Sequence, residues 1–504
     1  MTYDDIPLHR DYIAFQSRWL QLKHCLEGEE AVKAERETYL PYPVRVDDED
    51  KTSKEYQAMY ELFLQGAHFV EFTAEAVEDL VSSAFRRPLE IKKDAEVITE
   101  IEELDYIDFS DVGKEVVSNV GAYGRVFLLV DYPSVETVPN MIEDKDNKAY
   151  ITLYTPLDVL NWRETKRSGK VELVRVVLRE IDEVAIAESE DTEMGTTDIK
   201  YMYRELLIED GIYKIKIYRE DEDVKTIIPL ANGEHFTEIP GLFIGTTSNT
   251  ARVDKSPVMG ISNSNIKHYQ TWAELLYLQT YVGHPQLVLT GLTPGWNKQA
   301  EKQQFKVKMD AAEILALEGD SSAAQILEID TKQLIHFKTL EVLESSMAEQ
   351  GARIKAISHK AGVESAEALK IRTSASMSKL ASIVQNASEG LTAALKWLGE
   401  YMGEDLETYT ISINKEFYSP NPDGPFLTSI SNAEVAGTAP RGTALNYLKQ
   451  VELVDDNIPN ETYLKDMVLA TERTPMPNKQ QGGTSQINKV PGSAAIPAKN
   501  KNKN

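Results

Sequence analysis

The sequence of 504 residues contains a single cysteine, Cys25, so no disulfide can form within the chain, which fits a reducing cytoplasm. Cys25 lies on the apolar face of an expected helix, where a buried thiol packs rather than reacts. Uninterrupted apolar runs reach only about five residues, whereas a membrane-spanning helix needs about twenty. The first residues, Met-Thr-Tyr-Asp-Asp, provide neither a basic nor an apolar region. We therefore expect an intracellular protein with no signal peptide and no contact with a membrane.

Basic residues are scarce relative to acidic ones. The chain has 54 Lys and Arg against 81 Asp and Glu, a formal net charge of −27. Affinity for phosphate comes mainly from Lys and Arg, so a general nucleic-acid binder is not expected. The charge is compatible with a passage through which DNA slides without sticking. It is equally compatible with a large protein that is only kept soluble by its charge.

Signatures of catalysis and of cofactor binding are also missing. Gly121-Ala-Tyr-Gly124 precedes an expected strand and is not followed by Gly-Lys-Ser/Thr, so it is not a phosphate-binding loop. The eight histidines are scattered without metal-ligand spacing. Acidic pairs such as Glu102-Glu103 arise by chance among 81 acids. We expect no catalytic residue, no metal and no cofactor, and a multidomain enzyme that uses one of the acidic pairs stays the alternative.

The N-terminal quarter reads as helical and leads into a buried strand. Apolar residues recur at helical spacing over 10–27, and Ser53 and Thr73 are expected to cap two further helices. A fourth helix is expected near 110–120. The strand at 125–131 contains the continuous apolar run Val-Phe-Leu-Leu-Val, which is typical of a strand buried on both faces.

From residue 148 to residue 230 the apolar pattern has a period of two. Lys166–Lys170 and Glu209–Gly211 are expected to form hairpin turns, so the pattern predicts one antiparallel sheet. The expected strands cover 149–154, 171–180, 199–208, 212–219 and 224–229.

Ser256-Pro257 predicts the start of a long helix that ends near Val282, before Gly283-His-Pro285. Beyond Arg473 the chain has almost no apolar residues and is expected to be disordered. Between these points we expect a strand at 285–289, a helix at 296–309, a strand at 311–317, long helices at 331–359 and 363–401, and two short helices within 430–471.

These blocks, in their order along the chain, resemble portal proteins, the head–tail connectors of tailed bacteriophages. The blocks that carry the resemblance are Gly121–Pro133, Tyr154–Arg163, Lys255–Gly260, Gly283–Leu289, Met347–Ala352 and Glu364–Leu369. A podovirus-like subset of the family has residues similar to Trp19, Gly28, Tyr39–Pro41 and Phe85–Pro88. The chain departs from that subset at Glu364-Ser-Ala366, where the family motif reads Glu-Thr-Ala.

The resemblance implies an α+β subunit with a helical wing and crown, an antiparallel sheet in the wing, long stem helices and a small clip. The implied divisions are a wing at 1–255, a stem helix at 256–282, a clip at 283–295, a returning stem helix at 296–310, a wing strand, long helix and channel loop at 311–362, crown helices at 363–472 and a disordered tail at 473–504.

The resemblance also implies a non-enzymatic function in the virion. Portal subunits, usually twelve, form a ring at one capsid vertex, through which double-stranded DNA is packaged and ejected. The implied partners are further copies of the chain, the terminase large subunit, head-completion or adaptor proteins, and the major capsid and scaffolding proteins. Assembly would take place in the host cytoplasm. Another virion structural protein, such as a minor capsid or adaptor protein, stays an alternative.

Two groups of cations are candidate DNA-facing residues. Lys298, Lys302 and Lys306 step by four and share one face of the expected helix, which is also compatible with a solvated face partly neutralised by Glu301. The second group lies in Ser345–Gly362, the candidate channel loop, whose alternative interpretation is a plain helix–loop–helix corner. Its candidates are Arg353, Lys355 and Lys360.

Overall fold

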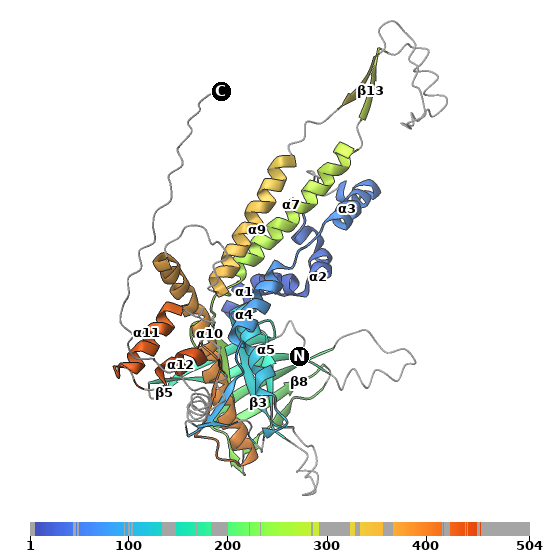
Figure 1. Cartoon of the computed structure of the whole chain (residues 1–504). Coiled ribbons are helices and arrows are strands. Elements are labelled where there is room, and N and C mark those ends of the chain that lie inside the picture. The colour runs from blue at the N-terminus through green and yellow to red at the C-terminus, as the bar shows by residue number, and fades with distance from the viewer. Residues whose placement is uncertain are drawn as a thin grey trace, which may run out of the picture. The chain divides into compact units, whose positions relative to one another are not determined.

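A computed structural model gives the fold of the chain (Figure 1). It divides into two compact units, Met1–Phe417 and Tyr418–Asn504. The structure describes residues 6–43, 47, 50–94, 96–98, 101, 104–133, 148–167, 169–182, 200–220, 222–231, 233–283, 286–291, 323–327, 333–355, 366–415, 417, 424–438, 440, 442–450 and 454.

The first unit opens with helices, as expected. They are α1 (Arg10–Glu27), α2 (Glu29–Ala34), α3 (Lys54–Gly66), α4 (Phe72–Ala84) and α5 (Phe109–Tyr123), with short 3-10 helices η2 (Arg36–Thr38) and η3 (Asp50–Thr52). Ser53 caps α3, because its side chain accepts a hydrogen bond from the Tyr56 amide. The expectation that Thr73 caps α4 is wrong. Thr73 lies inside the helix, and its hydroxyl donates to Asn265 Oδ1 at 2.9 Å.

A three-stranded antiparallel sheet lies at the centre of the main core. Its order is β12-β3-β4, from Gly241–Gly245, Arg125–Asp131 and Tyr150–Tyr154. Every residue of β3 is buried, which confirms the expectation of a strand covered on both faces. The register places Phe127 between Phe243 of β12 and Tyr154 of β4.

A five-stranded antiparallel sheet follows. Its order is β5-β6-β7-β8-β9, from Val159–Arg167, Lys170–Ile181, Tyr201–Glu209, Ile212–Tyr218 and Lys225–Ile227. The expectation of one sheet over 148–230 is therefore wrong in two respects, because β4 pairs with β3 instead of joining these strands, and because β5 was not among the expected strands. The hairpin turns between β5 and β6 and between β7 and β8 are confirmed.

The remaining strands form small antiparallel pairings. A three-stranded sheet joins β15 (Tyr409–Ser412), β1 (Glu90–Lys93) and β2 (Glu96–Ile98). Two hairpins pair β10 (Leu230–Ala231) with β11 (Glu234–His235), and β13 (Gln286–Thr290) with β14 (Ala323–Leu327). The mixture of helices and antiparallel sheets confirms the α+β class.

Three long helices follow the sheets: α7 (Met259–Gly283), α9 (Gln333–Lys355) and α10 (Ala366–Met402). The described side chains of α10 pack on the central sheet, where Asn386 Nδ2 donates to the Gly245 carbonyl at 2.8 Å. A Cβ on Gly390 would lie 2.4 Å from Ile244 Cδ1, so the helix approaches β12 closely. In the described part of the chain, none of the helices is long and apolar enough to cross a membrane.

The second unit contains two short helices, α11 (Gly424–Val435) and α12 (Thr443–Gln450). Two short helices were expected within 430–471, and the first begins before that range. The expected elements at 296–309 and 311–317 and the tail at 473–504 lie outside the described residues.

Candidate functional site

The most distinctive feature of the first unit is the pair formed by α7 and α9 (Figure 1). Helix α7 has 25 residues and α9 has 23, and the two helices run antiparallel. At 1.5 Å per residue, α7 is about 37 Å long. Two cross-helix contacts fix the pairing: His268 Nε2 lies 3.2 Å from Glu344 Oε1, and His336 Nε2 lies 3.8 Å from Glu274 Oε2. Residue numbers rise on one helix as they fall on the other, so the two helices are antiparallel.

A hairpin continues the helix pair at the end farthest from the sheets (Figure 1). Strand β13 begins three residues after α7 ends, and it pairs with β14 in a register that places Gln286 opposite Leu327. Val288 is 38% exposed on this hairpin. Helix α7, the hairpin and α9 thus form one helix–hairpin–helix unit, and the chain between the two strands lies outside the described residues.

A second hydrophobic core fixes α7 to the N-terminal helices. In this core Tyr269 and Ala273 of α7 pack among residues of α1 to α3 and the following loop, including Cys25, Tyr60 and Phe63. Asn265 adds polar contacts, because its Nδ2 donates to the Val70 carbonyl at 2.8 Å. Residues far away in the sequence thereby hold α7 from Asn265 to Ala273.

Cys25 reports on this core. Its side chain is fully buried, its Sγ accepts a hydrogen bond from Ser262 Oγ at 3.3 Å, and burial raises the pKa of the thiol to about 11. We expect a maleimide at pH 7.5 to label the native protein at least about a hundredfold more slowly than the urea-unfolded chain, because the thiolate is scarce and inaccessible. Mass spectrometry of timed samples measures the two rates. Similar rates in both states would mean that α1 and α7 separate readily.

A buried arginine fixes the loop that leads into α7. Arg125, at the start of β3, is 2% exposed, and burial lowers the pKa of its guanidinium to about 9. Its Nη1 donates to the Ala251 carbonyl at 3.0 Å, and its guanidinium lies 3.8 Å from the centre of the Phe243 ring. Ser256 completes the attachment, because its hydroxyl donates to the Ala122 carbonyl at 2.7 Å. The start of α7 is therefore bound to the end of α5 and to β3.

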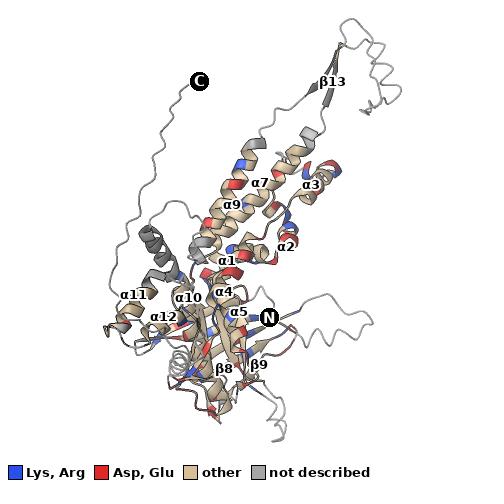
Figure 2. Cartoon of the chain, viewed as in Figure 1, with Lys and Arg blue, Asp and Glu red and all other residues tan. Residues whose placement is uncertain are grey.

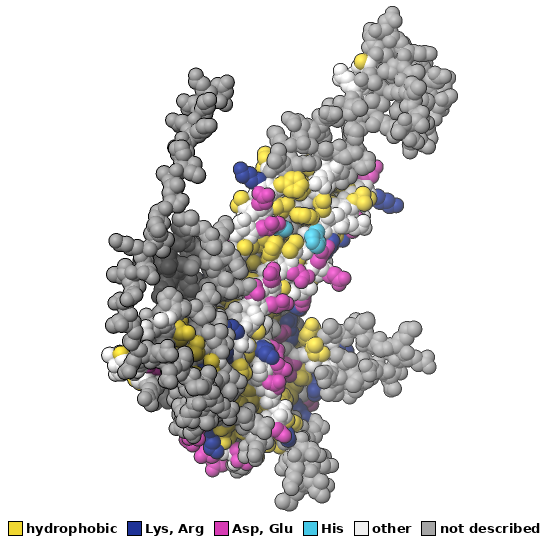
Figure 3. All heavy atoms as spheres, in the orientation of Figure 1, with side chains coloured by type: hydrophobic (Ala, Val, Ile, Leu, Met, Phe, Trp, Pro, Cys, Tyr) yellow, Lys and Arg dark blue, Asp and Glu magenta, His cyan; other side chains and the backbone are white. Residues whose placement is uncertain are grey.

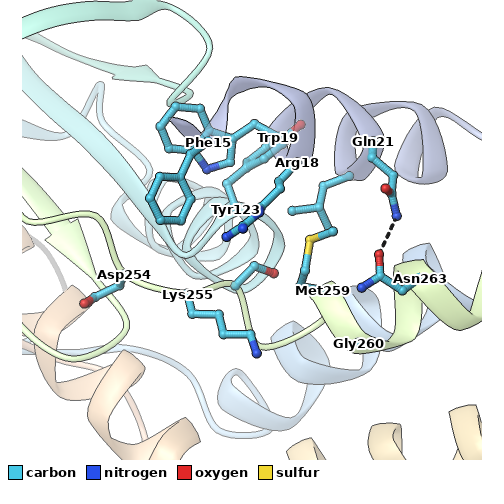
Figure 4. A pocket seen from close by; sticks show the side chains of 12 residues that line it. Phe15, Arg18, Trp19, Gln21, Tyr123, Asp254, Lys255, Met259, Gly260 and Asn263 are labelled. Carbon is cyan, nitrogen blue, oxygen red and sulfur yellow. Dashed lines mark hydrogen bonds between the residues drawn. The ribbon is translucent and has the colours of Figure 1, made fainter. Parts of the chain in front are cut away.

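A cavity of about 390 Å³ opens at this junction, between α1 and the first turn of α7 (Figure 4). Aromatic rings of Phe15, Trp19 and Tyr123 form one side, and Arg18 and Lys255 contribute charge. Gln21 donates to Asn263 at 2.9 Å across it. Asp254 adds a carboxylate to the lining, and the hydroxyl of Ser256 donates to the Ala122 carbonyl.

The residues predicted to face DNA fall where the structure gives no side-chain position. Lys298, Lys302, Lys306 and Lys360 lie outside the described residues. Arg353 and Lys355 belong to the last turn of α9, but their side chains are not described. Among the described residues, no cluster of three or more His, Cys, Asp or Glu could hold a metal ion.

Sequence reasoning missed a set of exposed apolar side chains around the helix pair. Figure 3 shows hydrophobic side chains gathered over the helix pair on the viewed face. Ile335 and Val342 of α9 are 60% and 62% exposed, and Leu62 of α3 is 71% exposed. The seven-residue spacing of Ile335 and Val342 places both on one face of a helix, but it does not show whether that face is buried or exposed. Large apolar side chains that are exposed on one helix face are candidates for contact with another protein.

Comparisons with known proteins give a family match for part of the chain. Residues 257–402, which contain α7, the hairpin, α9 and α10, match a family described as a domain of unknown function (DUF4055). No curated protein matches the chain.

Solved structures of gene transfer agent particles also align with the chain. A chain in the virion of the native particle is 11% identical with a TM-score of 0.33, over 78% of this chain and 91% of that one. A chain in the neck of the empty particle, computed with C6 symmetry, is 10% identical with a TM-score of 0.34, over 78% and 91%. A chain in the neck of the native particle, computed with C12 symmetry, is 8% identical with a TM-score of 0.34, over 75% and 89%. Likenesses of this size do not establish a shared fold or function.

Proposed function

We propose that the chain is the subunit of a portal, a ring-shaped head–tail connector at one vertex of a tailed-bacteriophage capsid. The observation that supports this most is the helix–hairpin–helix unit that projects from the part of the first unit that contains the sheets. It has the order that the resemblance implies for a stem, a clip and a returning stem. Helices α7 and α9 are then the two stem helices, β13 and β14 belong to the clip, and residues 1–255 form most of the wing.

This assignment extends the clip beyond the 283–295 expected from the sequence. The helix that lies beside α7 is α9, which begins at Gln333, whereas residues 296–310 were expected to return. The clip then includes the chain from Gly283 to the start of α9. The later part of α10 packs on the central sheet and so contributes to the wing as well as to the crown.

The function follows from repeating this unit around an axis. Copies of the α7–α9 pair placed side by side form the wall of a channel, while the sheets widen the ring at one end. Figure 2 shows acidic and basic residues interspersed along the helix pair and the sheets. With a net charge of −27 per subunit, such a wall holds DNA weakly, because few phosphates are neutralised and few counterions released. Double-stranded DNA can therefore slide through during packaging and ejection.

Partners follow from the two ends of the ring. The clip end offers the hairpin as a docking edge for the terminase large subunit during packaging and for head-completion or adaptor proteins afterwards. The wing contacts the major capsid and scaffolding proteins. Lys298, Lys302, Lys306, Arg353, Lys355 and Lys360 remain the candidates for transient contact with DNA phosphates. The portal has no catalytic role, and the terminase supplies the hydrolysis.

The oligomeric state of the purified full-length protein tests this proposal. We expect mass photometry to find particles near 680 kDa, which is twelve copies of 56.6 kDa, and negative-stain images to show a central hole. Rings of eleven or thirteen subunits would support the proposal as well, because cyclic packing is its essential element. Monomers or dimers at all protein and salt concentrations would overturn it in favour of an enzyme or of another virion protein.

A further inference from the structure

We infer that the ring closes through opposite flanks of the stem, where the α9 face that carries Ile335 and Val342 packs against the α3 face that carries Leu62 of the next subunit. This inference rests on the proposed ring and specifies the contact that holds it together. It is carried by the position of two exposed apolar faces relative to α7.

The α9 face points away from α7. Residues of α9 that contact α7 or the core, Leu340 and Met347, are 3% and 2% exposed. Ile335 and Val342 lie on another face, two turns apart, and Lys338 lies between them. The surface beside Val342 is hollowed, and Lys338, Ser345 and Glu349 are among the residues that line the hollow. This face therefore offers apolar side chains and a depression that could receive a side chain from a neighbour.

Helix α3 also has one face buried in a core and another face exposed. Tyr60, Phe63 and Leu64 point into the second core, where they are 1%, 4% and 9% exposed. The outward face carries exposed residues at steps of three and four, with Leu62 as its large apolar member. These residues are Glu55, Ala58, Leu62 and Gln65.

Helices α9 and α3, which carry the two faces, lie on opposite sides of α7 (Figure 1). The two faces are also at the same level along it. On one side, His336 lies 3.8 Å from Glu274, which places the adjacent Ile335 at that level. On the other side, the Phe63 ring lies 5.5 Å from the Tyr277 ring, which places the adjacent Leu62 there. Residues 274 and 277 are separated by about 4.5 Å along the helix axis, less than one turn.

A cyclic ring needs this arrangement. Its contacts are heterologous, so one flank of each subunit meets the opposite flank of the next. In a twelve-membered ring the neighbour is turned by about 30°, and rotation about the axis leaves the position along the axis unchanged. With the stem running along the axis, only faces at one level can meet. One pair of opposite charges can also meet, because Lys338 lies one turn from Ile335 on the α9 face and Glu55 lies on the α3 face, while Glu349 lies farther along α9 beside Val342.

Disulfide trapping tests the contact in the full-length chain. The double variant Leu62→Cys/Ile335→Cys is purified and oxidised, and its products are separated on a non-reducing gel. Cys25 does not interfere because it is fully buried. We expect a ladder of covalent multimers that collapses to monomer on reduction, and no ladder from either single variant. The matched control is Leu62→Cys/Phe337→Cys, because Phe337 is 46% exposed but lies on another face of α9. It should remain monomeric on the gel.

The outcomes separate this inference from the proposed function. Rings that assemble while Leu62→Cys/Ile335→Cys gives no ladder would overturn the contact and leave the portal proposal standing. Equal ladders from both double variants would also overturn it, because the trapping would then be unspecific. A dimer from Ile335→Cys alone would indicate a twofold contact and exclude the heterologous arrangement.

Discussion

Replacing Arg204 with methionine is expected to lower the free energy of unfolding by about 3–5 kcal/mol, because the buried Asp131 and the partly buried Glu180 lose their cation. Arg204 is on β7, and its guanidinium contacts Asp131 of β3 and Glu180 of β6. The three side chains are 12%, 6% and 16% exposed. Burial alone would lower the pKa of Arg204, but the two carboxylates raise it above its ordinary value. Tyr150 of β4 also donates to Asp131 within the central sheet, at 3.2 Å. The contact between Arg204 and Asp131 joins this sheet to the five-stranded one.

Urea-induced unfolding, followed by tryptophan fluorescence, measures the effect. Lys214→Met is the matched control, because Lys214 forms a 2.8 Å ion pair with Glu209, which is 46% exposed next to the turn between β7 and β8. Its unfolding midpoint should stay near that of the unchanged protein. The triple variant Arg204→Met/Asp131→Asn/Glu180→Gln should recover part of the loss, since no buried charge remains unpaired. If Arg204→Met unfolds at the same urea concentration as the control, the cluster does not hold the sheets together.

The sequence predicted those elements of the fold whose pattern is local. The apolar run at 126–130 predicted β3, and helical spacing predicted α1. Ser256-Pro257 predicted the start of α7. Pairing partners were harder, because a period of two shows that a segment is a strand without showing its neighbour. Tyr150–Tyr154 was therefore grouped with the strands that follow it, although its partner is β3. Thr73 looked like a cap because Thr is common there, but its hydroxyl bonds to Asn265, a residue 192 positions away.

The exposed apolar faces of α9 and α3 were even harder to predict from the sequence, because tertiary contacts decide which face of each helix is covered. The lysines at steps of four lie outside the described residues, so the helix face that they would share stays a prediction. Which face of α9 is covered depends on α7, and which face of α3 is covered depends on a core that includes Tyr269 and Cys25. The exposure of Ile335 and Leu62 results from these contacts, so no local pattern could distinguish them from core residues. Buried Arg125 was missed for the same reason, since an arginine at a strand start is usually exposed.

Gly124→Ala is expected to destabilise the first unit by about 3 kcal/mol or more and to loosen the start of α7. Gly124 has a φ of +89°, where a side chain is strained, and a Cβ there would lie 2.6 Å from the Asp254 carbonyl oxygen and 2.8 Å from the Ser256 amide nitrogen. Both contacts are with backbone of the loop that leads into α7, so the loop must move. Moving it would weaken the contact between the first turns of α7 and α1.

Gly211→Ala separates the two causes. Gly211 has a φ of +80°, but no atom within 4 Å would meet its Cβ, so this variant retains the backbone strain, about 1–2 kcal/mol, without the collision. We expect Gly124→Ala to unfold at a lower urea concentration than Gly211→Ala. We also expect it to raise the rate of maleimide labelling at Cys25 in the native state by more than tenfold, because Cys25 contacts Ser262 on α7. Labelling that is equally slow in both variants would show that the destabilisation stays within the sheets, and that the loop does not transmit it to the helix that we assign to the channel wall.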